Sequence, residues 1–381
     1  MTPMLRVTQA NPDPTFINLG IGQPALNLLP LAQIQQGAQM WLAENDPSAL
    51  NYGVEEGEGY LRVALAEWLS GEYGTAVSLS NLFISAGASQ ALDLICTLYS
   101  QPGDVVLVEE PTYFLALRIF ADHGLQVVGV AMDEQGLIPE AVEAAVRQHR
   151  PAFLYTIPSF QNPTAVTLPA ERRAQLVALA EQYGFLIVAD EVYQLLGYTA
   201  APPPPLASHS ASGHVLGIGS FSKILAPGLR LGWVQAAPQH LQRLVGSGLV
   251  DSGGGVNPLV SAVVRGVLTS GAQQAYVAQL RAEYGRRIRV LDEALQTHLP
   301  QAQYVVPQGG FFFWLSLPEG VDTAAQLPRA RALGVGYQPG RNFSSRGDLA
   351  SQLRLSFAFY DEEALREAAV RLGQWYRQLA P

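Results

Sequence analysis

Between residues 82 and 235 the sequence alternates short apolar runs with longer segments whose apolar residues recur at helical spacing. Runs that stay apolar throughout are typical of strands buried on both faces, and parallel strands need crossover connections such as helices. The alternation therefore predicts an α/β fold with a mostly parallel sheet covered by helices on both faces. The expected strands are 82–85, 104–108, 125–130, 152–156, 185–189, 215–219 and 231–235.

The pattern changes after about residue 240, where long helical stretches give way to a mixture of helices and short strands. A length of 381 residues is enough for two domains. We expect a large domain at 46–250 and a smaller α+β domain made of 1–45 and 251–381, with a ligand cleft between them. The elements expected in the second half are helices within 258–298, strands at 303–306 and 311–317, a helix at 322–333, a strand at 353–358 and a helix at 361–379.

Charge and composition argue against several classes of protein. The net charge is −9 without any cluster of basic residues, which disfavours nucleic-acid and anionic-membrane binding. The one cysteine, Cys96, allows no internal disulfide, and the six histidines lack metal-ligand spacing, so we expect no metal. With neither a signal peptide nor a membrane-spanning apolar stretch in view, we expect a cytoplasmic location.

Lysine is almost absent from this sequence. Of 23 basic residues, only Lys223 is lysine and the rest are arginine. A composition bias that replaces lysine by arginine on the surface explains the other positions. It does not explain Lys223, and arginine cannot supply the free amine that a Schiff base requires.

Polar residues follow several of the expected strands, at the edge where parallel sheets bind ligands. Small residues at 86–90 precede a helix, Asn162 follows strand 152–156, Asp190 and Tyr193 follow 185–189, and Ser220, Ser222 and Lys223 follow 215–219. Each has an ordinary alternative, such as a helix cap, a turn or a surface position. Together with Arg230 they are the groups that pyridoxal phosphate (PLP) needs: an amine, a carboxylate, ring-oxygen donors and a phosphate cradle.

At this point the sequence resembles the fold-type I, class I/II aminotransferases, and most of all their aminoadipate, aromatic and kynurenine branch. The resemblance covers nearly the whole chain. It is carried by INLGIGQPA (17–25), LNYGVEEGEGYLR (50–62), ISAGASQALDL (84–94), EEPTYF (109–114), IPSFQNPT (157–164), ADEVY (189–193), SFSK (220–223), PGLRLGW (227–233), PQGGFFFWL (307–315) and LRLSFAF (353–359).

The resemblance implies a transaminase and a role for each matching residue. Lys223 forms the aldimine with PLP and shuttles the proton, Asp190 pairs with the ring nitrogen, and Tyr193 and Asn162 bind the ring oxygen. Tyr113 stacks on the ring. The phosphate is held by Gly87, Ala88, Ser89, Ser220, Ser222 and Arg230.

Three further residues are implied at the substrate and at a subunit boundary. Arg354 binds the substrate α-carboxylate, beside Gly22 and Asn162. Tyr52 reaches the phosphate of a neighbouring subunit, which implies a homodimer with shared active sites. The sequence departs from the family at Ala165, where glycine is usual, and at Ala88 and Ser89, where Ser-Gln is frequent.

The substrate class depends on the segment 20–45, which contributes to the pocket in this branch. It contains no Lys, Arg or His, so we expect a neutral aromatic or aliphatic amino donor, with 2-oxoglutarate as the acceptor that the resemblance implies. The alternative is that its apolar residues only pack the small domain. A β-lyase or a cyclising PLP enzyme of specialised metabolism would share every cofactor residue and stays open at this point.

Overall fold

The computed structural model describes residues 8–10, 13 and 15–379, and its centre is one eight-stranded sheet. Neighbouring strands pair in parallel from β4 through β3, β6 and β7 to β8, whereas β9 runs antiparallel to both β8 and β2. The order across the sheet is β2 (Leu82–Ser85), β9 (Gly232–Ala236), β8 (Val215–Ser220), β7 (Leu186–Asp190), β6 (Phe153–Thr156), β3 (Val105–Glu110), β4 (Gln126–Asp133) and β5 (Gly136–Leu137).

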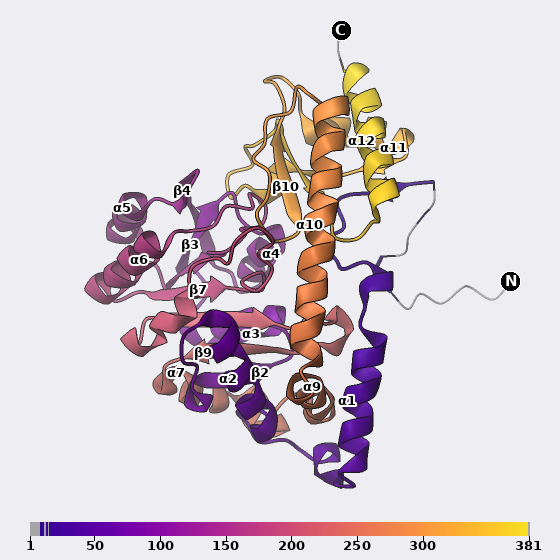
Figure 1. The fold of residues 1–381 in the computed structure, drawn as a ribbon. Coiled ribbons are helices and arrows are strands. Elements are labelled where there is room, and N and C mark those ends of the chain that lie inside the picture. Colours follow the sequence, from indigo (N-terminus) through magenta and orange to yellow (C-terminus); the bar gives the residue numbers. More distant parts are fainter. Residues whose placement is uncertain (1–7, 11–12, 14, 380–381) are drawn as a thin grey trace, which may run out of the picture.

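Alternate residues of the central strands pack into two separate apolar clusters, one on each face of the sheet. Val108 and Tyr155 belong to one cluster, and Leu107 and Leu154 to the other. The second cluster is closed by α5 (Pro139–His149) and α6 (Ala170–Tyr183), which pack side by side (Figure 1). The prediction of a mostly parallel sheet covered on both faces is confirmed.

The C-terminal part has a sheet of its own. Strand β13 (Gln352–Ser356) pairs with β10 (Phe312–Ser316) and with β12 (Gln338–Pro339), both antiparallel. The expected strand at 303–306 is wrong, because only Gln303 forms a bridge, to Ser316. Val305 and Val306 are 81% and 41% exposed, so these two apolar side chains cover no core. The remaining elements here are α11 (Thr323–Ala332), β11 (Val335–Gly336) and α12 (Glu362–Arg377).

Helix α10 (Ala272–His298) links the two regions, rising in Figure 1 from α9 (Pro258–Thr269) to α12. Within the described ranges, no helix combines the length and the apolar character needed to cross a membrane.

The N-terminal segment has contacts in both regions. Strand β1 (Ile17–Asn18) pairs with β11, whereas α1 (Leu31–Ala43) packs along α9. The two helix backbones meet at Gly37 and Gly266, where a Cβ on Gly37 would lie 2.3 Å from the carbonyl oxygen of Val263. Our division into 46–250 and 1–45 with 251–381 stays a prediction.

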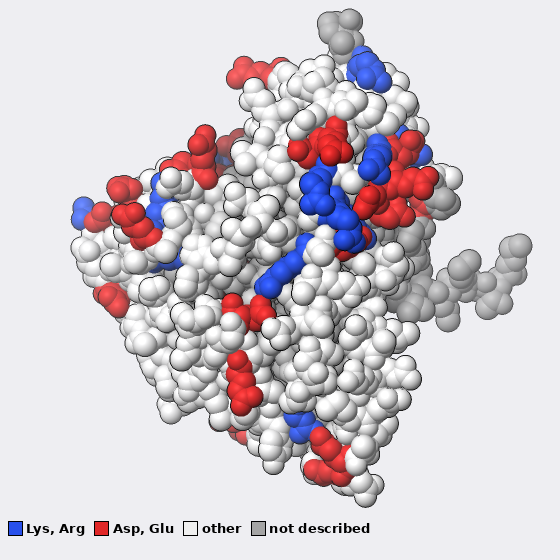
Figure 2. Space-filling model, viewed as in Figure 1, with Lys and Arg blue, Asp and Glu red and all other residues white. Residues whose placement is uncertain are grey.

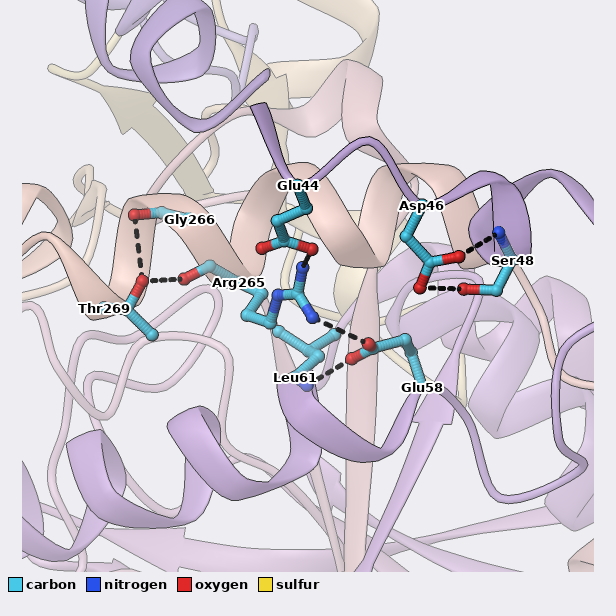
Figure 3. A network of polar contacts seen from close by, with 8 residues as sticks. All are labelled: Glu44, Asp46, Ser48, Glu58, Leu61, Arg265, Gly266 and Thr269. Carbon is cyan, nitrogen blue, oxygen red and sulfur yellow. Dashed lines mark hydrogen bonds and ion pairs between the residues drawn. The ribbon is translucent and has the colours of Figure 1, made fainter. Parts of the chain in front are cut away.

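Arg265, next to this crossing, ties the connection after α1 to α9. Its guanidinium contacts Glu44 at the end of α1 and Glu58, which caps α2 (Gly59–Tyr73) (Figure 3). The segment between these two carboxylates carries Tyr52, so both of its ends are fixed on α9.

Candidate functional site

The carboxyl ends of β2, β3, β6, β7 and β8 lie along one edge of the sheet, because these strands run parallel to one another. Each is followed by residues that the sequence singled out. Strand β9 runs the other way, so the residues before Gly232 reach the same edge. The predicted residues of this edge are Gly87, Tyr113, Asn162, Asp190, Tyr193, Lys223 and Arg230.

An anion cradle forms where α3 (Ala88–Tyr99) begins. Gly87 precedes the helix with φ of +91° and offers no side-chain cap, so the amides of Ala88 and Ser89 lie at a positive helix end. A Cβ on Gly87 would lie 2.7 Å from Nη2 of Arg230, so only glycine admits this approach. Ser89 and Arg230 are exposed, and Arg230 donates to the carbonyls of Ala86 and Pro227.

Two serines continue the cradle after β8. Ser220, the last residue of that strand, is buried, and its Oγ accepts a hydrogen bond of 3.1 Å from the amide of Ser222. Lys223 follows directly, so the hydrogen-bond donors suited to a phosphate and the amine come from one short turn.

Asp190 ends β7 with a carboxylate that is only half satisfied. Oδ2 accepts a 2.7 Å hydrogen bond from the hydroxyl of Tyr155, but the buried Oδ1 has no hydrogen-bond partner among the described residues. Burial raises the pKa of Asp190, and the Tyr155 bond, the Val192 amide and the charge of Lys223 oppose that rise. A buried oxygen without a partner calls for a donor from a ligand.

The Lys223 amine donates to the carbonyl oxygen of Gly22 at 2.9 Å. Burial lowers its pKa to about 8, and the positive charge of Arg354 acts in the same direction while Asp190 opposes it. A large fraction of neutral amine is therefore present near pH 8, which an ordinary surface lysine lacks.

Two tyrosines border the amine and the carboxylate. Tyr193 is buried with its ring 6.0 Å from Nζ of Lys223 and edge-on to Phe311. Tyr113 lies just before α4 (Phe114–Asp122), and burial, then the charge of Asp190, raises its pKa to about 12. Burial likewise raises the pKa of Tyr193, so both phenols stay protonated and able to donate at neutral pH.

Arg354 enters the site from β13 of the C-terminal sheet and is 2% exposed. Nη1 donates to Oδ1 of Asn162 at 2.8 Å and Nη2 to the carbonyl of Gly20 at 3.0 Å, while Nε has no partner among the described residues. Its guanidinium carbon lies 3.9 Å from the centre of the Phe312 ring. Burial lowers its pKa to about 10, so it remains charged at neutral pH.

Gly22 allows these groups to approach. A Cβ there would lie 3.0 Å from the Phe312 ring and 3.7 Å from Nη2 of Arg354. Tyr52 stands apart from them: it is 84% exposed, beside Gly254. The structure thus gathers the predicted residues except Tyr52 at one edge of the sheet within a single chain.

Sequence reasoning missed two residues of this site. Tyr155 lies in the expected strand 152–156 and resembles one more apolar position there, although a buried phenol needs a partner and finds Asp190. Glu109 begins the EEPTYF segment, in which the family resemblance implies a role for Tyr113 alone, and it is buried at 2% exposure. The two carboxylates at the end of this apolar strand were the available signal.

These groups fit PLP. Oδ1 of Asp190 lacks a partner that a protonated ring nitrogen would supply, and the charge of this carboxylate acts on the phenols of Tyr113 and Tyr193. The Gly87 turn with Ser220, Ser222 and Arg230 offers the donors that a phosphate needs. Lys223 supplies a primary amine with a lowered pKa, on which the charges of both Asp190 and Arg230 act.

Comparison with known proteins gives a consistent family. The family model for aminotransferase class I and II matches residues 14–372. Aromatic-amino-acid aminotransferase 1 of Thermococcus litoralis is 34% identical, with the alignment covering 95% of this chain and 88% of the relative.

Two solved structures show the same architecture. The kynurenine aminotransferase of Pyrococcus horikoshii, solved in complex with PMP, superposes with a TM-score of 0.90 at 32% identity, covering 96% of this chain and 92% of that one. The α-aminoadipate aminotransferase of Thermus thermophilus, complexed with N-(5'-phosphopyridoxyl)-L-leucine, gives 0.87 at 32% identity, covering 96% and 93%.

Proposed function

This chain belongs to the class I and II aminotransferases and uses PLP, and from that premise we propose that its amino donors are neutral amino acids with aromatic or aliphatic side chains. The acceptor we propose is a 2-oxo acid such as 2-oxoglutarate. The observation that supports this class of amino donor is the set of charged side chains around Lys223.

The charged side chains that act on the Lys223 amine are Arg354, Asp190 and Arg230. We assign Arg354 to the substrate α-carboxylate and Arg230 to the cofactor phosphate. That leaves no third cation among them for an acidic substrate side chain, whose carboxylate would be desolvated without a partner.

Two arginines lie at the ends of the segment that carries Tyr52, which a partner subunit would bring to the site in the proposed dimer, and both are already engaged. Arg265 pairs with Glu44 and Glu58 (Figure 3). Arg62 donates from Nε and Nη2 to the carbonyls of Leu82 and Leu79. Moving either toward a substrate would break these contacts, which supports a neutral side chain.

For the cofactor phosphate we propose the cradle of Gly87, Ala88, Ser89, Ser220, Ser222 and Arg230. Its backbone amides lie at a helix N-terminus, and Arg230 can give a two-pronged, charge-assisted contact. Tyr113 would pack on the ring face, where its phenol stays neutral.

For the ring we propose that Asp190 Oδ1 holds the proton of the ring nitrogen, while Tyr193 and Asn162 donate to the ring oxygen. Oδ1 of Asn162 accepts from Arg354, which directs its Nδ2 hydrogens elsewhere. Tyr155 keeps Asp190 in place through Oδ2.

Bound PLP supplies an aldehyde carbon and an electron-accepting ring. We propose that Nζ of Lys223 would hold that carbon in the resting enzyme, and that the same amine would take and return the proton of the substrate Cα. With a pKa near 8, Nζ can serve as both base and acid close to neutral pH.

We propose that Arg354 holds the α-carboxylate of donor and acceptor, with Gly22 and Asn162 bordering it. The Phe312 ring stacks under the guanidinium and keeps its plane fixed. A fixed α-carboxylate places the substrate amine relative to Nζ of Lys223.

We also propose a homodimer with shared sites, in which Tyr52 reaches the partner's phosphate. Large apolar side chains of α1, α2 and the connection between them are exposed, among them Leu31 at 78%, Tyr52 at 84% and Tyr60 at 73%. Figure 2 shows few charged side chains over this lower part of the molecule. Such a face is typical of a buried interface. We likewise propose a cytoplasmic location.

The test of the donor class is a comparison of kcat/KM for Phe, Leu and Met against aminoadipate and aspartate, with one acceptor held constant. Methionine and aminoadipate form a matched pair of similar length. We expect at least a tenfold preference for the neutral donors, equivalent to about 1.4 kcal/mol. Faster turnover of aminoadipate or aspartate would contradict the proposal.

The acceptor needs its own measurement, because the distal carboxylate of 2-oxoglutarate meets the same shortage of cations. Pyruvate provides the comparison without a second carboxylate. A kcat/KM for 2-oxoglutarate at or above that for pyruvate supports the proposed acceptor. Absence of turnover with 2-oxoglutarate would contradict it.

A further inference from the structure

Glu109 is a buried carboxylate that the proposed chemistry does not use. It lies near the carboxyl end of β3 and is 2% exposed. Neutral groups hold it: Thr156 donates its hydroxyl at 2.5 Å, the Ile157 amide donates at 3.2 Å to both oxygens, and Gln161 donates Nε2 at 2.9 Å.

All of these donors come from one stretch, the end of β6 and the loop that leads to Asn162. A carboxylate buried without a cation costs several kcal/mol of solvation, which an apolar residue of similar size would avoid. A role for the donors that Glu109 orders would account for this cost.

Gln161 links Glu109 to the residues that follow it in the loop. Its Nε2 also donates to the carbonyl of Pro111 at 2.8 Å, and its Oε1 accepts from the amide and the hydroxyl of Thr164, at 2.8 and 2.7 Å. The Gln161 side chain therefore bridges β3 and the turn that holds Asn162. Asn162 in turn accepts from Arg354.

We propose that Glu109 is a positioning residue, which acts through Gln161 to fix the Asn162 amide between Arg354 and the ring oxygen of the cofactor. This inference rests on the proposed function, because the contact between Asn162 and the ring oxygen is part of that proposal. Loss of Glu109 would loosen both the substrate carboxylate site and the donor to the ring oxygen.

The experiment uses the cofactor-loaded enzyme and the variants Glu109→Gln and Gln161→Ala. In Glu109→Gln the new amide NH₂ faces donors, so Gln161 or the Ile157 amide loses its acceptor. We expect KM for the amino donor to rise about tenfold and kcat to fall less than threefold. We also expect the pH midpoint of the bound cofactor's absorbance to rise by about one unit, because the anionic ring oxygen loses a donor.

Gln161→Ala keeps the test decisive where Glu109→Gln does not fold. It should reproduce both shifts, and the double variant should show no further increase, since both changes break the same relay. If the two single variants keep wild-type KM and midpoint, whatever their thermal stability, the positioning role is wrong.

Glu191→Gln is the matched control. Glu191 is also a buried carboxylate that accepts hydrogen bonds from backbone amides, those of Leu206 and Ala207, although the charge of Arg173 acts on it as well, and neither of these bonds involves Gln161 or Asn162. Its loss should lower the melting temperature without changing KM or the midpoint. A shift of KM and midpoint equal to that of Glu109→Gln would mean that loss of any buried carboxylate suffices, which overturns the proposal.

The variant Asn162→Ala distinguishes a failure of this inference from a failure of the proposed function on which it rests. If Asn162→Ala leaves the midpoint unchanged, the assignment of Asn162 to the ring oxygen fails. If Asn162→Ala moves the midpoint while Glu109→Gln and Gln161→Ala do not, that assignment stands and the role of Glu109 fails.

Discussion

The lowered pKa of Lys223 has a cost for stability that depends on pH. An unfolded lysine has a pKa near 10.5, and the folded one has about 8, with burial as the largest cause. Between these values the unfolded chain binds more protons than the folded chain, so stability rises as pH increases from 8 to about 10.5. Below pH 8 the full cost of a buried cation is present.

Replacing this amine by an apolar group should therefore stabilise the cofactor-free protein. We expect Lys223→Met to raise the free energy of unfolding at pH 7 by roughly 2 kcal/mol, allowing for the partial exposure of the side chain. The gain should vanish above about pH 10.5, while activity is lost at every pH. Denaturant titrations at several pH values measure it, and a gain independent of pH would contradict the assigned cause.

Single residues were predictable from sequence where their chemistry is unusual for their position. Asp190 at the end of an apolar strand and the lone Lys223 are of this kind, and the structure brings both to one edge of the sheet. For Tyr155 and Glu109 the sequence shows an unusual residue type, but not the partner that gives it a role. Their partners, Asp190 and Gln161, lie 35 and 52 residues away in sequence, and only strand pairing brings them together.

At the scale of single elements, the turn after Asn162 contains a backbone position that suits glycine. Ala165 has φ of +61°, in the left-handed region where a Cβ crowds the following carbonyl. Its amide donates to the carbonyl of Gln161, which closes the turn. The departure noted in the sequence at this position thus leaves the turn in place with a strained alanine.

Ala165→Gly should relieve that strain. We expect a rise in unfolding free energy of roughly 0.5 kcal/mol, since a relief of about 1 kcal/mol is partly offset by the greater freedom of glycine in the unfolded chain. Ala174→Gly, at an exposed position inside α6, should have the opposite sign and cost about 1 kcal/mol. Thermal melts of the two variants decide it, and a lower melting temperature for Ala165→Gly would refute the strain.

Most elements were predictable because their periodicity was strong. The central strands agree with the expected ranges to within a few residues, but the antiparallel direction of β9 was not predicted, since an apolar run carries no sign of direction. The segment 303–306 shows the opposite failure: its apolar residues suggested a strand, but it finds no partner except at Gln303. The short β5 was missed because two residues give no period.

At the scale of the whole molecule, the exposed apolar face predicts self-association. We expect light scattering to give a mass of about twice the 41.0 kDa of the chain. Leu31→Asp should shift the protein toward the monomer, because it places a charge in the buried interface. Val305→Asp is the control, since Val305 is equally exposed but lies in the C-terminal region. A monomeric wild-type protein, or equal effects of both changes, would contradict the dimer.

The single lysine also makes the peptide chemistry of this protein unusually simple. A protease that cuts only after lysine has one cleavage site, so the unfolded chain yields two fragments, 1–223 and 224–381. If Lys223 holds the cofactor as proposed, reduction with borohydride would fix it on Nζ, block that site and leave the chain whole. The ratio of intact chain to fragments on a denaturing gel therefore counts the fraction of molecules that carried the cofactor, without any measurement of activity.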